Sequence, residues 1–181
     1  MIKAAVLAFG GLDILVNNAG TTHRNQPLMG VTEAEFDRIY AVNVKSIYLT
    51  TLASVPELQK RGGGSIINLS SVAGLTGAAF AVPYNASKGA VRLMTKGAAL
   101  ECAQLGLKIR VNWIHPGVIE TKMGQQVMDD FVAAGNGGAN EVRANVIALH
   151  PLGRLGVPAD IASAVVFLAS DDAAFMTGSE I

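Results

Sequence analysis

The chain has 181 residues, half of them hydrophobic, and a formal net charge of zero. This length can bury the core of a single domain over residues 1–181, and the balanced charge favours neither nucleic acid nor an anionic membrane surface as a partner. Mean hydropathy is positive, but no apolar run approaches the ~20 residues of a membrane-spanning helix, so we expect no membrane partner and attribute the hydropathy to buried strands.

Short apolar strands alternate with longer helices along the chain. Thr32 and Glu35 form a capping-box pattern before the longest helical stretch, in which Asn43 and Pro56 are expected to mark kinks or breaks. In chain order the pattern predicts a helix over residues 1–9, a strand over 12–16, a helix over 33–60, a strand over 65–69, a helix over 84–104, a strand over 109–114 and a helix over 158–169. Residues 120–155 have a weaker pattern of short helical pieces, which we interpret as a substrate lid.

This order of elements predicts an α/β fold with a parallel sheet wrapped by helices. Ligands of such sheets bind at the carboxyl ends of the strands. Polar or glycine-rich clusters follow each of the three strands, at residues 17–20, 70–74 and 115–117. The candidate site therefore lies where these clusters meet.

Tyr84 and Lys88 stand four positions apart, so a helix places them on one face. A pair at this spacing is weak by itself, because it could be an ordinary surface contact. Ser71 at one strand end and the Asn17-Asn18-Ala19-Gly20 cluster at another strengthen the functional interpretation. A hydroxyl, a phenol and an ammonium that converge in this way could polarise and protonate a carbonyl group.

Taken together, the motifs resemble those of the short-chain dehydrogenase/reductase family. The resemblance rests on Asn-Asn-Ala-Gly at residues 17–20, Asn43, Ser70-Ser71, Tyr84-x-x-x-Lys88 and Pro-Gly-x-x-x-Thr at residues 116–121, in the family's order. It implies a doubly wound, Rossmann-like sheet and hydride transfer between NAD or NADP and a small alcohol or carbonyl substrate. It also implies a homo-oligomer, a dimer or a tetramer, for the complete protein.

The resemblance assigns the catalytic roles to Asn43, Ser71, Tyr84 and Lys88. Tyr84 would be the general acid/base, which near pH 7 requires its pKa to fall by ~3 units, or about 4 kcal/mol. An ammonium ~5 Å away at an effective dielectric of ~20 contributes roughly 3 kcal/mol, so Lys88 is expected to lower that pKa. Ser71 would bind the substrate oxygen. Asn43 would hold a water in a proton relay, or else it is only a local helix break.

The resemblance places the cofactor against the edge formed by the strand ends. The implied cofactor-binding residues are Asn17, Ala19, Gly20, Tyr84, Lys88, Pro116, Gly117, Val118 and Thr121. Among them, Lys88 would bind the nicotinamide ribose, Val118 would offer its backbone groups to the carboxamide, and Thr121 would reach that group by its side chain. Asn17 is interpreted either as a cofactor-side residue or as a residue that fastens the sheet.

Other candidate features carry less weight. Gly62 to Gly64 precede a strand, whereas phosphate-binding glycines follow one and open a helix, so we expect an ordinary turn. The three histidines have no metal-ligand spacing, so we expect no metal site. Met123, Met128 and Phe131 could line a substrate pocket or pack the lid. The single Cys102 cannot form an intramolecular disulfide, and the cytoplasm is the default location.

The sequence also departs from the family pattern. The family's first strand and glycine-rich pyrophosphate turn, the residue that separates NAD from NADP, and the last strand expected after Thr177-Gly178 are not found in these residues. We therefore expect a partial sheet that lacks its N-terminal half. The alternative function is a truncated, non-catalytic remnant or interaction module of the same fold. The substrate and the choice between NAD and NADP stay open.

Overall fold

The computed structural model describes residues 1–181 and contains one parallel sheet of three strands in the order β1-β2-β3. The strands are β1 (Ile14–Asn17), β2 (Gly64–Leu69) and β3 (Ile109–Ile114). Because all three are parallel, their carboxyl ends lie at one edge of the sheet. The α/β prediction is confirmed, and the predicted strand limits differ from the observed ones by at most two residues.

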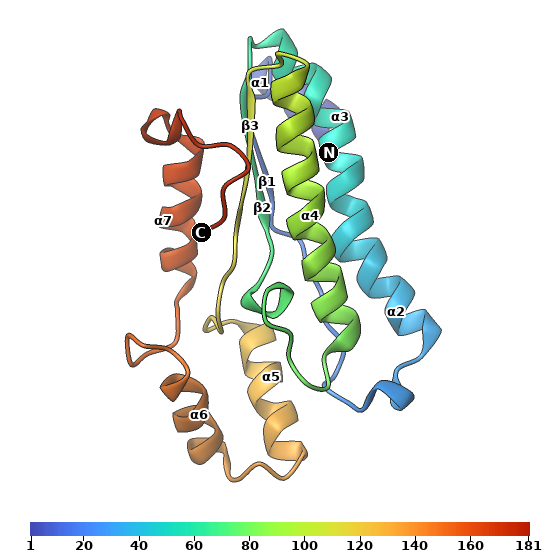
Figure 1. Cartoon of the computed structure of the whole chain (residues 1–181), viewed down its shortest axis with the longest axis vertical. Helices are drawn as coiled ribbons and strands as arrows, with labels where there is room; N and C mark the ends of the chain where they lie inside the picture. The colour runs from blue at the N-terminus through green and yellow to red at the C-terminus, as the bar shows by residue number, and fades with distance from the viewer.

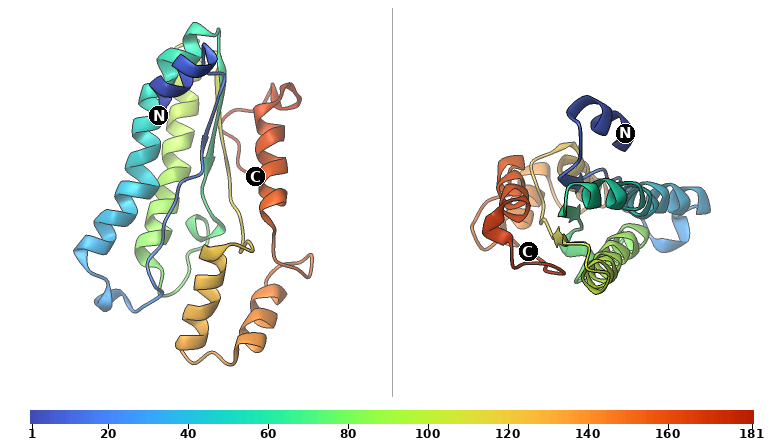
Figure 2. Two further views of the ribbon diagram at one scale, coloured as in Figure 1. Left: turned by 180° about the vertical axis from the view of Figure 1, so that it is seen from behind. Right: turned by 90° about the horizontal axis from the view of Figure 1, so that it is seen from above.

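Helices cover both faces of the sheet (Figures 1 and 2). On one side α3 (Ser46–Lys60) and α4 (Val82–Gln104) run antiparallel to the strands, and α7 (Pro158–Ala169) lies on the other side. A short α1 (Ile2–Phe9) packs beside α3 and ends at Gly10, whose φ of 77° is the left-handed conformation that glycine favours.

Each face of the sheet has its own hydrophobic core. Leu15, Ile66 and Val111 face α3 and α4 and pack with Leu58 of α3, whereas the neighbouring Ile67 faces α7. Since successive strand residues point to opposite faces, a strand buried on both faces is apolar at most of its positions. This explains the apolar runs and the positive mean hydropathy. None of the helices combines the length and the hydropathy that a membrane crossing requires.

The long helical stretch before β2 is interrupted near one of the two predicted positions. The helix α2 (Glu33–Tyr40) opens with the predicted capping box between Thr32 and Glu35 and continues through a π-helical turn, Ala41–Lys45, into α3. Asn43 lies at the centre of that turn, so the predicted interruption is real. Pro56 does not break the helix, because α3 continues through it.

Residues 120–155 fold into a helical hairpin, α5 (Lys122–Ala133) and α6 (Ala139–Ala148), which extends beyond the carboxyl edge of the sheet (Figure 1). Met128 is buried against Val142, Val146 and Leu155, with Phe131 packed alongside. Two of the three predicted pocket-or-packing residues, Met128 and Phe131, therefore pack within the hairpin itself.

The last residues of the chain lie along β3. Trp113 forms an isolated parallel bridge with Glu180, and the His115 N–H donates to the carbonyl of Ile181 at 2.6 Å. The last strand, which we expected to be wholly absent, is thus represented by its first residues. The N-terminal half of the expected sheet is not among residues 1–181, and β1 forms an edge.

Two leucines of α3 provide a matched test of this core. Leu58 is completely buried against the sheet, while Leu52 is 59% exposed on the outer side of the same helix. We expect Leu58→Ala to lower the free energy of unfolding by about 2–5 kcal/mol and Leu52→Ala to change it by no more than about 0.5 kcal/mol. Urea titration followed by the fluorescence of Trp113 measures both. Equal losses would show that the core is not where the structure places it.

Candidate active site

The candidate site lies at the carboxyl edge of the sheet, where the loops after the three strands meet. These loops are residues 18–20 after β1, 70–74 after β2 and 115–118 after β3. The start of α4 approaches the same edge, because α4 runs back along the sheet from there (Figure 1). The topology thus brings together residues that lie far apart in the sequence.

Tyr84 lies in the first turn of α4 and faces Ser71. Burial raises the pKa of the Tyr84 phenol, and a hydrogen bond with the Ser71 side chain acts in the opposite direction. The Ser71 hydroxyl also accepts a hydrogen bond from the N–H of Ala73 at 3.2 Å. At neutral pH the phenol is therefore protonated and stands beside a hydroxyl, so it can donate a proton.

Lys88 lies one helical turn after Tyr84 and is only 5% exposed. Its Nζ donates to the carbonyl of Leu69, the last residue of β2, at 2.7 Å and lies 5.7 Å from the centre of the Tyr84 ring. Burial lowers the pKa of Lys88 to about 8. The expectation that Lys88 lowers the pKa of Tyr84 is wrong for this geometry, because removal from water disfavours both the ammonium and the phenolate.

The Asn43 side chain makes hydrogen bonds to the loop after β1 and to α4. Its Oδ1 accepts from the Thr21 N–H at 2.8 Å, and its Nδ2 donates to the Thr21 carbonyl and to the Ser87 hydroxyl, both at 2.9 Å. A Cβ added at Gly20 would lie 3.6 Å from both Asn43 Oδ1 and Lys88 Nζ. Asn43 is therefore both the centre of the π-helical turn and a neighbour of Lys88.

Asn17 fastens the sheet from within. Its Nδ2 donates to Asn68 Oδ1 at 2.8 Å, and its Oδ1 accepts from the Thr50 hydroxyl at 2.7 Å. The Asn68 amide in turn donates to Thr95 of α4 at 2.9 Å. Of the two alternatives for Asn17, this geometry fits the fastening one, whereas the following Ala19 and Gly20 are exposed.

Both backbone groups of Val118 already have partners in the chain. Its N–H donates to His150 Nε2 at 3.1 Å, and its carbonyl accepts from the Gly156 N–H at 3.1 Å. The neighbouring Ile119 N–H has no hydrogen-bond partner. The Thr121 hydroxyl caps α5 by accepting from the Gly124 N–H at 3.2 Å. The free donor in this loop is therefore at Ile119, one residue after the predicted position.

The loop between residues 20 and 26 is held from two sides. Arg38 of α2 donates to the Thr21 hydroxyl at 2.6 Å, and the Asn25 N–H donates to the buried carboxylate of Asp130 in α5 at 2.9 Å. His23 is buried in this loop with no hydrogen bond to either ring nitrogen, and burial lowers its pKa. The helical hairpin is thus fastened to the loop that follows β1.

Several residues of the site escaped the sequence interpretation. The Ser70 hydroxyl donates to the Lys88 carbonyl at 2.9 Å and so ties the end of β2 to α4. The roles of Asn68 and Thr95, however, were not anticipated. A polar residue within the apolar run of β2 was the available signal for Asn68, since a buried amide requires a partner.

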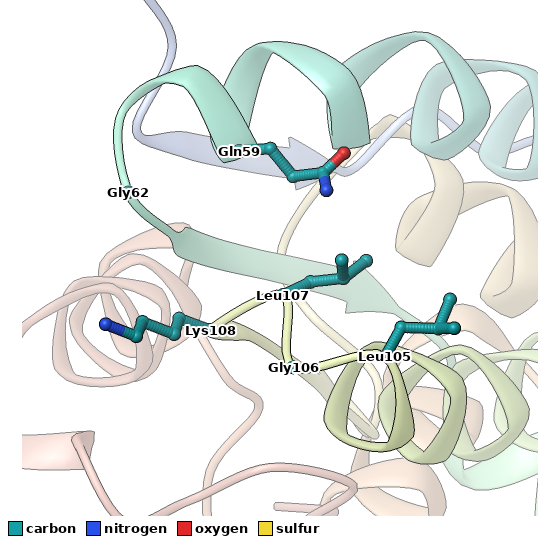
Figure 3. A pocket seen from close by; sticks show the side chains of 6 residues that line it. All are labelled: Gln59, Gly62, Leu105, Gly106, Leu107 and Lys108. Carbon is teal, nitrogen blue, oxygen red and sulfur yellow. The ribbon is translucent and has the colours of Figure 1, made fainter.

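A surface hollow lies at the opposite edge of the sheet. It has a volume of about 320 Å³ and is lined by polar backbone and the side chains in Figure 3. The lining residues are Gln59, Gly62, Leu105, Gly106, Leu107 and Lys108. No titratable pair or hydroxyl cluster lies there, so this hollow is not the candidate site. No group of three His, Cys, Asp or Glu side chains could hold a metal ion.

Comparisons with known proteins agree on one family. A family model described as "Enoyl-(Acyl carrier protein) reductase" matches residues 1–181. The chain is 45% identical over 178 residues to a 4-formylbenzenesulfonate dehydrogenase of Comamonas testosteroni, which covers 98% of this chain and 68% of that protein. It is 43% identical to a cyclopentanol dehydrogenase of Comamonas sp. (strain NCIMB 9872), with 94% of this chain and 63% of that protein covered.

A solved structure of NAD⁺-bound xylitol dehydrogenase is similar throughout. The TM-score is 0.93 at 30% identity, with 99% of this chain and 70% of that chain covered. The chain spans 63–68% of the length of the two curated relatives. The likeness therefore includes every loop of the candidate site and leaves about a third of each relative outside the comparison.

The buried amine of Lys88 makes stability depend on pH. Between pH 8 and the ordinary lysine value of 10.5, the unfolded chain keeps a proton that the folded chain has released. The free energy of unfolding therefore rises with pH across this window, by about 3 kcal/mol from this group. We expect Lys88→Met to remove this rise and Lys45→Met, at an exposed site, to retain it. Urea titrations at pH 7.5, 9 and 10 measure the difference. Parallel curves for wild type and Lys88→Met would contradict the assigned burial.

Proposed function

This chain belongs to the short-chain dehydrogenase/reductase family, and on that premise we propose that the protein is an NAD- or NADP-dependent oxidoreductase acting on a small alcohol or carbonyl compound. One observation carries the proposal: a half-buried, protonated phenol lies beside a serine hydroxyl and one helical turn from a buried amine. This combination can bind a carbonyl oxygen and exchange a proton with it.

The residues present fit the nicotinamide half of the cofactor. Gly20 leaves space beside Asn43 and Lys88 that a side chain would fill, and the Ile119 N–H is an unused donor in the next loop. When bound, the nicotinamide supplies the hydride donor or acceptor. Gly62 and Gly63 form a turn that precedes β2, at the wrong end of a strand for a pyrophosphate. The described residues therefore support binding of one half of the dinucleotide.

In the proposed roles, Tyr84 gives a proton to the substrate oxygen during reduction and takes one during oxidation. Ser71 donates a hydrogen bond to the same oxygen as negative charge develops on it. Lys88 would bind the nicotinamide ribose and, through a water near Asn43, would return protons to Tyr84. Because burial raises the pKa of Tyr84, the chain without its cofactor is prepared for proton donation.

The carboxamide of the nicotinamide would bind the loop after β3. This loop contains Pro116, Gly117 and Val118, and Thr121 lies at its end. We place the donated hydrogen bond at the Ile119 N–H, since the Val118 N–H would first have to leave His150. Because the Asn17 side chain also has hydrogen-bond partners within the chain, we regard it as a support of the cofactor loop. Ala19 and Gly20 would be the residues of this loop that contact the cofactor.

The substrate class is that of small carbonyl compounds or alcohols. The relatives named above act on 4-formylbenzenesulfonate and on cyclopentanol, so both compounds belong in a substrate panel. The lid over residues 120–155 would set the specificity, because it extends past the edge where Ser71 and Tyr84 lie. Nicotinamide absorbance, followed with both NADH and NADPH, identifies substrate and cofactor together.

Two tyrosine variants test the proposed chemistry. Tyr84→Phe removes only the phenolic oxygen, so we expect turnover in the full-length gene product to fall by about 10²–10⁴-fold while the dinucleotide affinity is retained. Tyr48→Phe, at a tyrosine 55% exposed on α3, is the matched control and should be neutral. Nicotinamide absorbance and isothermal titration with the dinucleotide provide the two measurements. Unchanged turnover in Tyr84→Phe would refute the role of Tyr84.

A second candidate function is assembly without catalysis. Large apolar side chains are exposed on the outer sides of the two long helices, away from the sheet. They are Tyr48, Leu49 and Leu52 on α3 and Leu93 and Leu100 on α4. A second copy of this chain would cover both helices in a symmetric dimer. This surface supports a homo-oligomer under either function.

Leu93 and Leu100 provide the test of this surface, since they are 71% and 73% exposed. We expect the double variant Leu93→Lys/Leu100→Lys to shift the protein from dimer or tetramer to monomer in sedimentation velocity. Leu149→Lys, at a leucine 80% exposed beyond the end of α6, is the control and should sediment as wild type does. A double variant with the wild-type sedimentation coefficient would exclude these helices as the interface.

A further inference from the structure

His115 has no role in the reaction described above, yet it joins the only tryptophan of the chain to the candidate active site. Its side chain is 4% exposed. The Trp113 indole N–H donates to His115 Nε2 at 2.6 Å, and His115 Nδ1 lies 2.9 Å from the carbonyl oxygen of Ser71. The imidazole thus lies between a buried indole and the backbone of the residue proposed to hold the substrate.

These two contacts determine where the imidazole carries its proton. An indole N–H can only donate, so His115 Nε2 must offer its lone pair to Trp113. The proton then resides on Nδ1, which donates to the Ser71 carbonyl. Trp113 is completely buried, so its N–H would have no partner if Nε2 were protonated.

Glu180 is the one competitor for Nε2. Its Oε2 lies 3.2 Å from that nitrogen and would favour a proton there. However, Arg92 already holds both carboxylate oxygens of Glu180, with bonds of 2.7 and 2.8 Å. Because the carboxylate has this second partner and the indole has none, the Nδ1–H form prevails.

The contact between the His115 ring and the Ser71 carbonyl holds the Ser71 backbone beyond the end of β2, where strand pairing has stopped. The Val72 N–H donates to the Pro116 carbonyl at 3.1 Å, but Pro116 has no N–H to offer in return. The His115 ring provides an N–H instead. The Ser71 carbonyl also accepts from the Gly74 N–H of its own loop at 2.9 Å. His115 and Pro116 are the partners that tie the peptide group between Ser71 and Val72 to the loop after β3, one at its carbonyl and one at its N–H.

We propose that His115, kept in its Nδ1–H tautomer by Trp113, is a positioning residue that holds the Ser71 peptide and thereby directs the Ser71 hydroxyl toward Tyr84. The effect on turnover rests on the proposed function of Ser71. The tautomer and the contact with the Ser71 carbonyl do not, and they are measurable in the chain without substrate or cofactor.

The first measurement uses the wild-type 181-residue chain. Long-range ¹H–¹⁵N correlation spectra report which ring nitrogen of each histidine is protonated, and the His115→Asn spectrum identifies the His115 signals. We expect a protonated Nδ1, an unprotonated Nε2 and a Trp113 indole proton shifted downfield. A protonated Nε2, or an imidazole that averages between both forms, would overturn the proposal.

The second measurement compares two variants. In His115→Asn the amide nitrogen can take the place of Nδ1, whereas His115→Leu keeps the bulk and loses the donor. The ¹³C shift of the Ser71 carbonyl should change in His115→Leu and return toward the wild-type value in His115→Asn. Circular dichroism confirms that each variant is folded. A Ser71 shift that is the same in all three proteins would overturn the contact.

Turnover by the full-length gene product separates this proposal from the proposed function. A misplaced catalytic group can cost about 10²-fold in rate, so we expect kcat to fall by about 10–100-fold in His115→Leu, with the dinucleotide Kd unchanged, and to recover at least partly in His115→Asn. Equal kcat in wild type and His115→Leu would overturn the positioning role. A wild-type protein inactive on every substrate would instead refute the proposed function, and the two spectroscopic results would still decide the contact.

Discussion

The parallel register of the three strands is the constraint on which the site depends. Asn17 pairs with Asn68 across β1 and β2, and Leu69 pairs with Ile114 across β2 and β3. All three strands therefore end close together at the same edge of the sheet. A shift of one residue would turn every side chain of a strand to the other face. Because helices cover both faces of β2 and β3 and one face of β1, such a shift would bury polar groups and expose apolar ones. The apolar cores thus fix the height at which the three loops emerge.

Buried polar pairs convert this register into fixed side-chain positions. The Asn17–Asn68–Thr95 series crosses from β1 through β2 to α4, and Asn43 ties the loop after β1 to α4 through Ser87. An unpaired buried amide costs roughly 1–3 kcal/mol, so each of these groups strongly favours the arrangement that satisfies it. The helix carrying Tyr84 and Lys88 is therefore held against the strand ends by hydrogen bonds as well as by hydrophobic contact.

Much of the fold could be predicted because its signals are local. Hydrophobic periodicity, glycine stops and the Thr32–Glu35 capping box located the strands and the helices outside residues 120–155 to within about two residues, whereas the limits of α5 and α6 were not predicted. The meeting of Ser71, Tyr84 and Lys88 followed from the rule that parallel strands end together. The π-helical form of the turn around Asn43, the partner of Asn17 and the bond between Val118 and His150 were not predictable. They depend on which side chains meet across more than 20 residues of sequence, which no local pattern contains.

The pKa of Tyr84 shows where reasoning from sequence spacing fails in physical terms. Spacing alone gives the distance between a phenol and an ammonium, and Coulomb attraction at that distance predicts a lowered pKa for the phenol. Burial opposes this, because each charged form loses its hydration, and here it raises the pKa of Tyr84 and lowers that of Lys88 to about 8.

The Lys88 ammonium already donates a hydrogen bond to the Leu69 carbonyl. A positive charge brought close to both groups would lower the pKa of Tyr84 again, since it would attract the phenolate without further burial of the phenol. In the proposed function, Tyr84 would therefore keep its proton until a positively charged group binds, and this would couple proton transfer to occupation of the site.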